Sequence, residues 1–252
     1  MKRPTSQQRL AVRERPNGRK PSMLQNWRDL LFLHWPYDPA AVQMMLPRGL
    51  HVDTYDNAAY MGVVPFFMVD VRPFMLPPTI FYSNFPELNF RTYVHDEEGN
   101  PGVWFFSLDA ANWLAVEAAR RWYHLPYFHA EMTGGRDADT GEIDYYSKRV
   151  GTDESQACEF VYAPASDFEP AEPGSLEFFL IERYLLFAWS EKQQQLFKGQ
   201  VYHPPYPLCE VNVIDYNDSL FEINGLARPG VAPIHAIMSP GVDVEIFSLE
   251  KI

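Results

Sequence analysis

The feature that most limits how this chain can fold is a succession of short apolar and aromatic runs separated by turn-forming residues. Groups such as Asp56-Asn57 and Glu98-Gly99-Asn100 stand between the runs and favour tight turns. Within the runs the pattern is that of β-strands. A proline-rich stretch at 72–86 is expected to be a long loop, and long ordered loops are often functional. The expected strands cover 51–55, 59–69, 87–94, 102–108, 127–132, 143–150, 157–162, 195–202 and 242–247, with a strand or buried entry segment at 27–35.

Helical patterns are few. Asp38 is a suitable N-cap with Pro39 in the first turn, which predicts a short helix ending near Leu46. A second helix is expected from Ser175 to about Trp189, apolar on most sides. The clearest helix covers 110–123, and its predicted packing face is Ala111, Leu114, Ala115, Ala118, Ala119 and Trp122. Many strands with two or three helices predict a β-rich α+β fold built on a mostly antiparallel β-barrel or curled sheet.

Charge divides the chain into a short tail and one domain. Residues 1–22 hold seven basic side chains against one acidic one, a net charge of +6, so in a chain of −12 overall the remainder carries −18. The tail has almost no apolar residues to bury and is predicted to be disordered. The remaining residues, 23–252, are expected to form a single domain, because a hydrophobic share of 46% is ample for one large core.

Three interpretations of the basic tail stand beside one another. It could be an arm for nucleic acid or another anionic surface, or a targeting peptide, although it lacks the apolar region of a secretory signal. The favoured interpretation is an upstream extension without function, with Met23 as a second start. The acidic domain argues against nucleic-acid binding, and no apolar stretch is long enough to span a membrane. With only two cysteines, a disulfide framework is excluded and a cytoplasmic location is expected.

The most informative strand is FPELNFRTY at 85–93. In the antiparallel sheets of most proteins a polar strand face is exposed to solvent. In a closed barrel the same face lines a cavity, and Glu87 and Arg91 would meet there as a charged pair that orients a polar ligand. Aromatic neighbouring strands favour the cavity. Strand alternation places Glu87, Asn89, Arg91 and Tyr93 on this polar face, with Leu88, Phe90 and Val94 on the opposite one.

Histidines supply further candidates. His124 and His129 lie five residues apart across a proline, which is not the spacing of a helical metal pair. His34 and His203 lie beside prolines and aromatics, where a histidine is more often buried and bonded to the backbone. Only the number of histidines points to a three-histidine zinc site, so no metal is expected.

Two other candidates are Ser107 and Arg183. Ser107 ends a strand together with Asp109, but no nucleophile-elbow sequence surrounds it. Arg183 falls within the second predicted helix, where it must pair with a carboxylate or reach a ligand. Pairing with Glu87, Glu177 or Glu182 is the favoured interpretation. The chain has no glycine-rich phosphate loop, so no nucleotide cofactor is expected.

Several motifs together resemble the YqjF-like (DUF2071) family of uncharacterised bacterial proteins, which is distantly similar to acetoacetate decarboxylase. The resemblance implies an antiparallel barrel or cone with a central, mostly apolar pocket shaped by a glutamate and an arginine. In the decarboxylases a lysine that follows a proline forms a Schiff base with the keto acid. The resemblance rests on LLFLHWP at 30–36, GVVPF at 62–66, FPELNFRTYV at 85–94, GVWFFSLDA at 102–110, HLPYFHAEM at 124–132, GSLEFFLIERY at 174–184, VYHPPYPL at 201–208 and GVDVEIF at 241–247.

The resemblance also indicates which mechanism is missing. Aligned on its proline, the stretch HLPYF puts Tyr127 and Phe128 where the decarboxylases have two lysines, and a phenol cannot form an imine. The lysines left in the domain are Lys148, Lys192, Lys198 and Lys251. Lys192 and Lys251 are expected to be solvated. Lys148 and Lys198 lie on predicted strands and stay conceivable as the imine-forming lysine, although the ordinary expectation for them is also the surface. Decarboxylation through a Schiff base is therefore not expected.

The leading hypothesis is an enzyme that acts on a small carbonyl or carboxylic acid compound without an organic cofactor. Glu87 would be its acid or base, and Arg91 or Arg183 would hold a carboxylate. The rival is a non-catalytic barrel that binds an apolar small molecule. A third hypothesis is a structural module or homo-oligomer in which the polar pairs are internal ties. Hydrogen-bonding or proton-shuttling roles are assigned to Tyr127, His124 and His129, and further ligand contacts to Asn89, Ser107 and His203.

Overall fold

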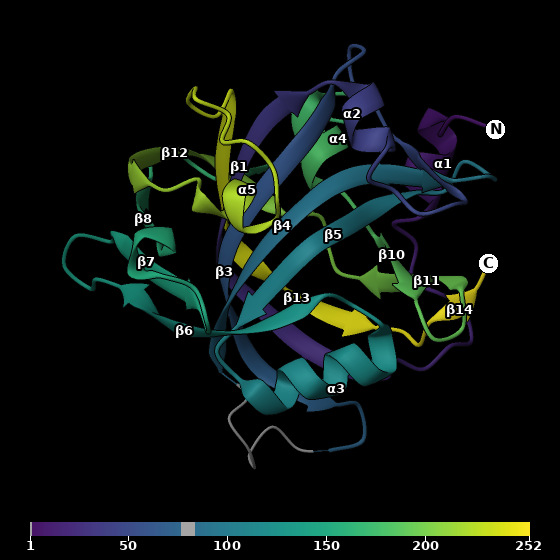
Figure 1. Ribbon diagram of the computed structural model, residues 1–252, viewed down its shortest axis with the longest axis horizontal. Coiled ribbons are helices and arrows are strands. Elements are labelled where there is room, and N and C mark those ends of the chain that lie inside the picture. The colour runs from purple at the N-terminus through teal and green to yellow at the C-terminus, as the bar shows by residue number, and fades with distance from the viewer. Residues whose placement is uncertain (1, 77–83) are drawn as a thin grey trace.

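The computed structural model describes residues 2–76 and 84–252, and its centre is a wall of five antiparallel strands (Figure 1). Within the described part of the chain these strands belong to one 14-stranded sheet. Each strand pairs with the next over most of its length, in the order β13-β1-β3-β4-β5. The wall consists of β13 (His235–Ile246), β1 (Met23–Tyr37), β3 (Ala59–Pro73), β4 (Phe85–Asp96) and β5 (Pro101–Ala110).

The two ends of this wall are joined twice, which gives two rings of strands. The first ring closes through β10 (Leu185–Ser190) and β11 (Gln195–Tyr202), which run from β5 to β13. The second ring closes on the other side of the wall, to the left in Figure 1, through four more strands. These are β6 (Tyr127–Arg136), β7 (Ile143–Arg149), β8 (Cys158–Pro164) and β12 (Pro207–Tyr216). The β-rich fold predicted from the sequence is confirmed.

Because the wall is shared, both of its faces are buried. Leu30 and Phe32 of β1 belong to the apolar core of the first ring, whereas Leu31 and Leu33, which alternate with them, belong to the core of the second. The same alternation holds along β4. Polar side chains in the middle of the wall, such as Glu87 and Asn89 of β4, therefore point into an interior and not into bulk solvent.

Short strands and helices complete the rings. Val116 of α3 and Leu180 of α4 pack into the core of the first ring, and Leu220 of α5 packs into the core of the second. No helix in the described part of the chain is long and apolar enough to span a bilayer. The remaining elements are β2 (Leu50–Val52), β9 (Glu169–Pro170), β14 (Glu250–Lys251), α1 (Ser6–Ala11), α2 (Pro39–Gln43), α3 (Trp113–Tyr123), α4 (Leu176–Ile181), α5 (Ser219–Ile223) and the 3-10 helix η1 (Glu154–Gln156).

The buried face of α3 differs from the alanine-rich face predicted for it. Leu114 is 52% exposed and Trp122 is 70% exposed, whereas Val116 is 2% exposed. The helix contacts the first ring's core along a narrow stripe, with Ala115 and Tyr123 at its margins. A helix that touches a core with so small an area does not need to bury every apolar residue at helical spacing. The side chain of Ala118 lies outside the described part.

The second predicted helix is shorter than expected, because α4 ends at Ile181 and the continuation is strand β10. Glu182 breaks the helix with φ −80° and ψ 74°. Phe187 and Trp189 then lie in a strand paired with β11. A short apolar run has no period that separates a buried helix from a buried strand, and pairing with neighbouring strands decides the outcome. The predicted loop at 72–86 is framed by β3, which ends at Pro73, and β4, which starts at Phe85; its centre, 77–83, lies outside the described residues.

The basic tail, for which the composition predicts disorder, lies along the domain in the structure. Residues 2–22, here called the N-terminal strap, contain α1 and lie against the acidic surface (Figure 1). Ion pairs with the oppositely charged domain supply the contacts that apolar burial would otherwise give. The guanidinium groups also lie over aromatic rings, among them Phe179 and Phe247. The pairs are Arg9 with Asp53, Arg13 with Glu182, Arg15 with Glu245, and Arg19 with Glu250.

Candidate functional site

Glu87 is a buried carboxyl group inside the first ring. It lies on β4, only 2% exposed, and faces the same interior as Asn89. The parallel pairing of β6 with β5 places Tyr127, the first residue of β6, beside Leu108. From there the Tyr127 hydroxyl donates a 3.0 Å hydrogen bond to Glu87 Oε2, and the side chain of Asn89 donates a second bond to the carboxyl.

Burial controls the proton on Glu87. Desolvation raises the pKa of Glu87 to about 8, the hydrogen bonds from Tyr127 and Asn89 oppose this rise, and the nearby Asp109 adds to it. Burial also raises the pKa of Tyr127 well above its ordinary value. At neutral pH the pair is therefore mostly protonated. A carboxyl with a pKa near the working pH can give a proton and take it back, which is what acid–base catalysis requires.

Arg91 is a cation without a carboxylate partner in the same interior. It is half-buried, and its guanidinium lies 5.5 Å from the ring centre of Phe32 and 5.6 Å from that of Tyr93. One Nη donates to the carbonyl of Leu180 at 3.3 Å, while Nε has no hydrogen-bond partner. Within 2–76 and 84–252 no carboxylate lies at ion-pair distance from it. A guanidinium with unused donors among aromatic rings is suited to bind a carboxylate.

The predicted ion pair between Glu87 and Arg91 is absent from the described residues. Four residues apart on one strand, their Cα atoms are separated by about 14 Å. Glu87 bonds to Tyr127 and Asn89, and Arg91 bonds to Leu180 in α4. The protonated carboxyl of Glu87 and the positively charged guanidinium of Arg91 therefore lie at separate places in the same interior.

Tyr93, which lies beside Arg91, is hydrogen-bonded to a pair of histidines. Its hydroxyl lies 2.6 Å from His34 Nε2, and His34 Nδ1 lies 2.9 Å from His235 Nδ1. His34 and Tyr93 are fully buried. Gly62 leaves room for this contact, because a Cβ at that position would lie 3.1 Å from the Tyr93 hydroxyl. The sequence singled out His34 as a histidine beside Trp35-Pro36, but it gave no sign that His235 lies opposite.

Arg183 pairs with Asp53, which was not among its predicted partners. Its Nη1 lies 2.8 Å from Asp53 Oδ2, and its Nε donates to the carbonyl of Phe179 at 2.6 Å. Asp53 also accepts two 2.7 Å bonds from Arg9 of the strap. The prediction of Glu87, Glu177 or Glu182 was wrong because Asp53 follows β2, and a strand neighbour cannot be inferred from spacing along the chain.

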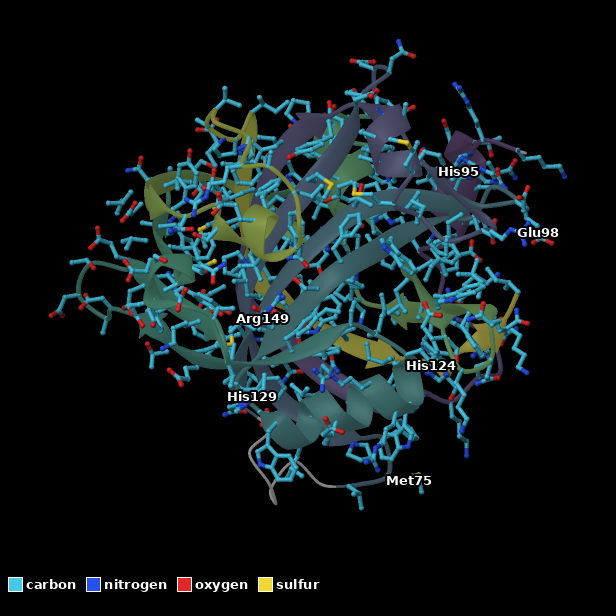
Figure 2. All side chains as sticks on the ribbon, in the orientation of Figure 1. Met75, His95, Glu98, His124, His129 and Arg149 are labelled. Carbon is cyan, nitrogen blue, oxygen red and sulfur yellow. The ribbon has the colours of Figure 1, made fainter. Side chains whose placement is uncertain are left out.

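The other predicted site residues lie apart from Glu87. Figure 2 shows His124 and His129 near opposite ends of α3 in that view. His124 ends the helix in the left-handed region, with φ 52°, and His129 is exposed. Ser107 lies on the second ring's side of the wall, where it accepts a 3.1 Å bond from Asn224. His203 is buried, stacks on Tyr184 and donates to the carbonyl of Pro204, and burial lowers its pKa to about 4.

A second polar cluster, which the sequence did not predict, lies where the two rings meet. Arg149 makes a 2.7 Å ion pair with the buried Asp109, and its guanidinium stacks 3.9 Å from the ring centre of Phe128. Burial raises the pKa of Asp109, and the charge of Arg149 opposes that rise. Because Asp109 also raises the pKa of Glu87, the cluster helps to keep Glu87 protonated.

The lysines lie where the sequence places them. The ammonium group of Lys148 sits 3.2 Å from Glu131 and 3.1 Å from Glu154, and these carboxylates raise its pKa. Lys192 and Lys251 are exposed, and Lys198 is half-buried on β11. A protonated surface lysine is a poor nucleophile for imine formation. In the described part of the chain, no group of three or more His, Cys, Asp or Glu is arranged to hold a metal ion.

Two hollows lie on the outside of the first ring. One, of about 570 Å³, lies between the end of α3 and β10 and touches Tyr127 and His124. The other, of about 580 Å³, lies between β9 and α4 and is acidic. Its charged lining residues are Asp167, Glu169, Glu172, Glu177 and Glu210.

Solved structures share this fold at low sequence identity. The enduracididine biosynthesis enzyme MppR complexed with pyruvate superposes with a TM-score of 0.63 at 13% identity, over 93% of this chain and 91% of that chain. Acetoacetate decarboxylase from Legionella pneumophila gives 0.62 at 12% identity, over 92% and 87%. An acetoacetate decarboxylase-like enzyme from Sphingomonas wittichii RW1 gives 0.61 at 13% identity, over 95% and 97%. The fold is therefore that of acetoacetate decarboxylase.

Sequence comparison identifies the family. The protein YqjF of Bacillus subtilis (strain 168) is 37% identical over 212 residues, which cover 84% of this chain and 85% of that protein. Residues 24–243 match the DUF2071 family, described as an uncharacterized conserved protein, and the N-terminal strap lies outside the match. The resemblance noted in the sequence is confirmed, and the chain belongs to the DUF2071 family.

Proposed function

We propose that the first ring binds a small carboxylic acid that also carries a carbonyl group, and that Glu87 and Tyr127 exchange a proton with it. One observation carries the proposal: a buried carboxyl with a pKa of about 8, bonded to a tyrosine, shares an interior with the guanidinium of Arg91, whose Nε has no hydrogen-bond partner. No organic cofactor is needed for this chemistry. The resemblance in fold to enzymes of keto acids supports the choice of ligand.

Arg91 would hold the carboxylate of the ligand. Its Nε and second Nη can donate two parallel bonds, and the rings of Phe32 and Tyr93 keep water away from them. Low polarity around the pair strengthens it. The Cα atoms of Glu87 and Arg91 are separated by about 14 Å, so one ligand would meet the two groups at its opposite ends.

Glu87 would act on the other end of the ligand. In its protonated form it donates a hydrogen bond to the carbonyl oxygen, which draws electrons from the neighbouring carbon. In its ionised form it removes a proton from the carbon next to the carbonyl carbon, so that the C–H electrons form an enolate with its negative charge on the oxygen, and the proton returns from Glu87 in the reverse step. Tyr127 holds Oε2 in place and shares the negative charge while the carboxylate is ionised.

The rival function, capture of a ligand without chemistry, is favoured by the aromatic character of the same interior. Phe32, Phe66 and Tyr206 belong to its core, and Trp27 packs against it. Such a lining binds apolar surface with little need for polar groups. The two functions differ in what Glu87 does, so one substitution separates them.

The test combines binding and exchange. Short keto acids and carboxylic acids are screened by native mass spectrometry and thermal shift against the wild type, Arg91→Gln, Glu87→Gln and Tyr127→Phe, with the exposed Arg121→Gln as control. Arg91→Gln should weaken binding at least about tenfold. Deuterium exchange at the methyl group of bound pyruvate, followed by proton NMR in D2O, should need Glu87. Binding without exchange would favour the capture function, and binding indifferent to Arg91→Gln would refute the site.

A further inference from the structure

Beside Arg91, three buried side chains form a continuous row of groups that can both give and accept a proton. The row runs from the Tyr93 hydroxyl to His34 Nε2 at 2.6 Å, and from His34 Nδ1 to His235 Nδ1 at 2.9 Å. His235 Nε2 has no hydrogen-bond partner. The carboxylate of Glu177, which borders the acidic hollow, lies 3.8 Å from it.

The geometry allows this row to accept one proton without losing a hydrogen bond. In one neutral tautomer of the two rings, Tyr93 donates to His34 Nε2, and His34 Nδ1–H donates to His235 Nδ1. When a proton binds at His34 Nε2, that nitrogen donates to Tyr93, whose own hydrogen turns to another acceptor. A second proton would place two N–H groups face to face at the 2.9 Å contact. The capacity of the row is therefore one proton.

When His34 is protonated, the Tyr93 hydroxyl needs a new acceptor for its hydrogen. An anion bound beside Arg91 would be that acceptor. The Tyr93 ring is 5.6 Å from the guanidinium of Arg91 and 5.1 Å from that of Arg183. Arg183 is paired with Asp53, which it shares with Arg9, whereas Arg91 has no carboxylate partner among the described residues. A bound carboxylate would cancel the charge of Arg91 and offer oxygen atoms to Tyr93.

We propose that the anion site beside Arg91 takes up one proton together with its ligand, and that Tyr93, His34 and His235 hold this proton. The inference rests on the proposed binding of an anion at Arg91. The free site is set for uptake: burial, His235 and Arg91 lower the pKa of His34, and burial lowers the pKa of His235 while Glu177 opposes that change. The site then prefers a carboxylic acid plus its proton over the carboxylate alone.

A first experiment needs no ligand. Histidine-labelled full-length protein is titrated by nitrogen NMR as wild type, Arg91→Gln and Arg91→Lys, with the signals assigned through His34→Gln and His235→Gln. Removing the charge in Arg91→Gln should raise the midpoint of the His34–His235 pair by about one pH unit, and Arg91→Lys should keep it low. Equal midpoints in the three proteins would overturn the proposal.

A second experiment uses pyruvate as the probe. Calorimetric titration at pH 7 in two buffers of different ionisation enthalpy gives the number of protons taken up on binding, expected to approach one in the wild type and to vanish in His34→Gln. Pyruvate that binds without proton uptake would overturn the inference and leave the proposed function standing. If pyruvate does not bind but Arg91→Gln raises the midpoint, the proton coupling of Arg91 to the row holds and the proposed ligand fails.

Discussion

At the scale of single residues, the molecule keeps an acid in an environment made for a neutral group. Glu87 has its proton because the surrounding core cannot solvate a negative charge, and its two hydrogen bonds offset only part of that cost. The arrangement lowers stability at high pH, where the proton must leave or the protein must open. Such a cost in stability is common where side chains serve a function.

Replacing Glu87 by Gln should flatten the dependence of stability on pH. The folded-state pKa of about 8 lies above the ordinary value of 4.5, so the folded protein holds a proton that the unfolded chain has released. This contribution is fully present below pH 4.5 and is lost as the pH rises through 8. Between pH 5 and 9 the unfolding free energy of the wild type should fall by of the order of a few kcal/mol more than that of Glu87→Gln. Urea unfolding measures the difference, with the exposed Glu159→Gln as control; parallel curves would contradict it.

Replacing Tyr127 by Phe should raise the pKa of Glu87 further. The lost hydrogen bond is one of the two that favour the ionised carboxyl. The decrease of the unfolding free energy at alkaline pH should therefore begin at a higher pH. At neutral pH the unfolding free energy should be about 1 kcal/mol lower than in the wild type. Tyr146→Phe, which removes an exposed hydrogen bond to Glu154, is the matched control. A shift of the pH profile toward acid would count against the assignment.

Strand alternation predicted which side chains share a face at this scale, but not what they bond to. Glu87, Asn89 and Tyr93 lie on one face of β4, as a period of two requires. The partners Tyr127, His235 and Asp53 come from distant parts of the chain. Their proximity depends on strand pairing, which a single sequence does not reveal.

At the scale of elements, the junction of β5 with β10 decides whether the first ring closes. The two strands are parallel and pair through only two positions, Leu186 with Val103 and Phe187 with Trp104. Gly102 makes the close approach possible, because a Cβ there would lie 2.7 Å from the carbonyl oxygen of Leu185. This contact is backbone, so it cannot be relieved by turning a side chain.

Gly102→Ala should therefore destabilise the protein by about 1–3 kcal/mol. Gly135→Ala is the control, since Gly135 also lies in a strand and a Cβ there would meet no atom within 4 Å. Chemical denaturation gives both values. Hydrogen exchange should show the loss concentrated in β10 and β11 if the ring opens there. Equal effects of the two substitutions would mean that the junction tolerates a side chain.

Element boundaries show the limits of a single sequence most clearly at 176–189. The run is apolar throughout, so neither a period of 3.6 nor a period of 2 stands out. The structure divides it into α4 and β10. The N-cap Ser175 was predictable from its chemistry, and it bonds to the backbone of Phe178 as expected. The end of the helix was not, because β10 exists only through its pairing with β5 and β11.

At the scale of the whole molecule, the N-terminal strap fastens onto the end of the first ring through charge. Arg9 and Arg13 reach Asp53 and Glu182, two carboxylates whose side chains are 4% and 1% exposed. Glu182 otherwise accepts bonds only from neutral groups, the Tyr184 hydroxyl and the amide of Tyr206. Composition predicted disorder because it measures apolar burial and takes no account of a complementary surface.

The combined substitution Arg9→Gln and Arg13→Gln should remove about 1–3 kcal/mol of stability at low salt. Because salt screens the partly exposed pairs, the gap from the wild type should narrow as sodium chloride is raised to about 1 M. Lys192→Gln, an exposed charge change, serves as the control. Urea unfolding at several salt concentrations makes the measurement, and a gap independent of salt would show that the strap is held by packing.

The shared wall ties the two interiors to each other. Leu88 and Phe90 alternate with Glu87 and Asn89 along β4, and their side chains pack into the core of the second ring. A bulkier side chain that reshapes the first interior pushes β4 into a core with no free volume on its far side. Packing on the two faces of β4 must therefore change in step during evolution. Among related sequences, residues on the two faces of β4 are therefore expected to be substituted in pairs.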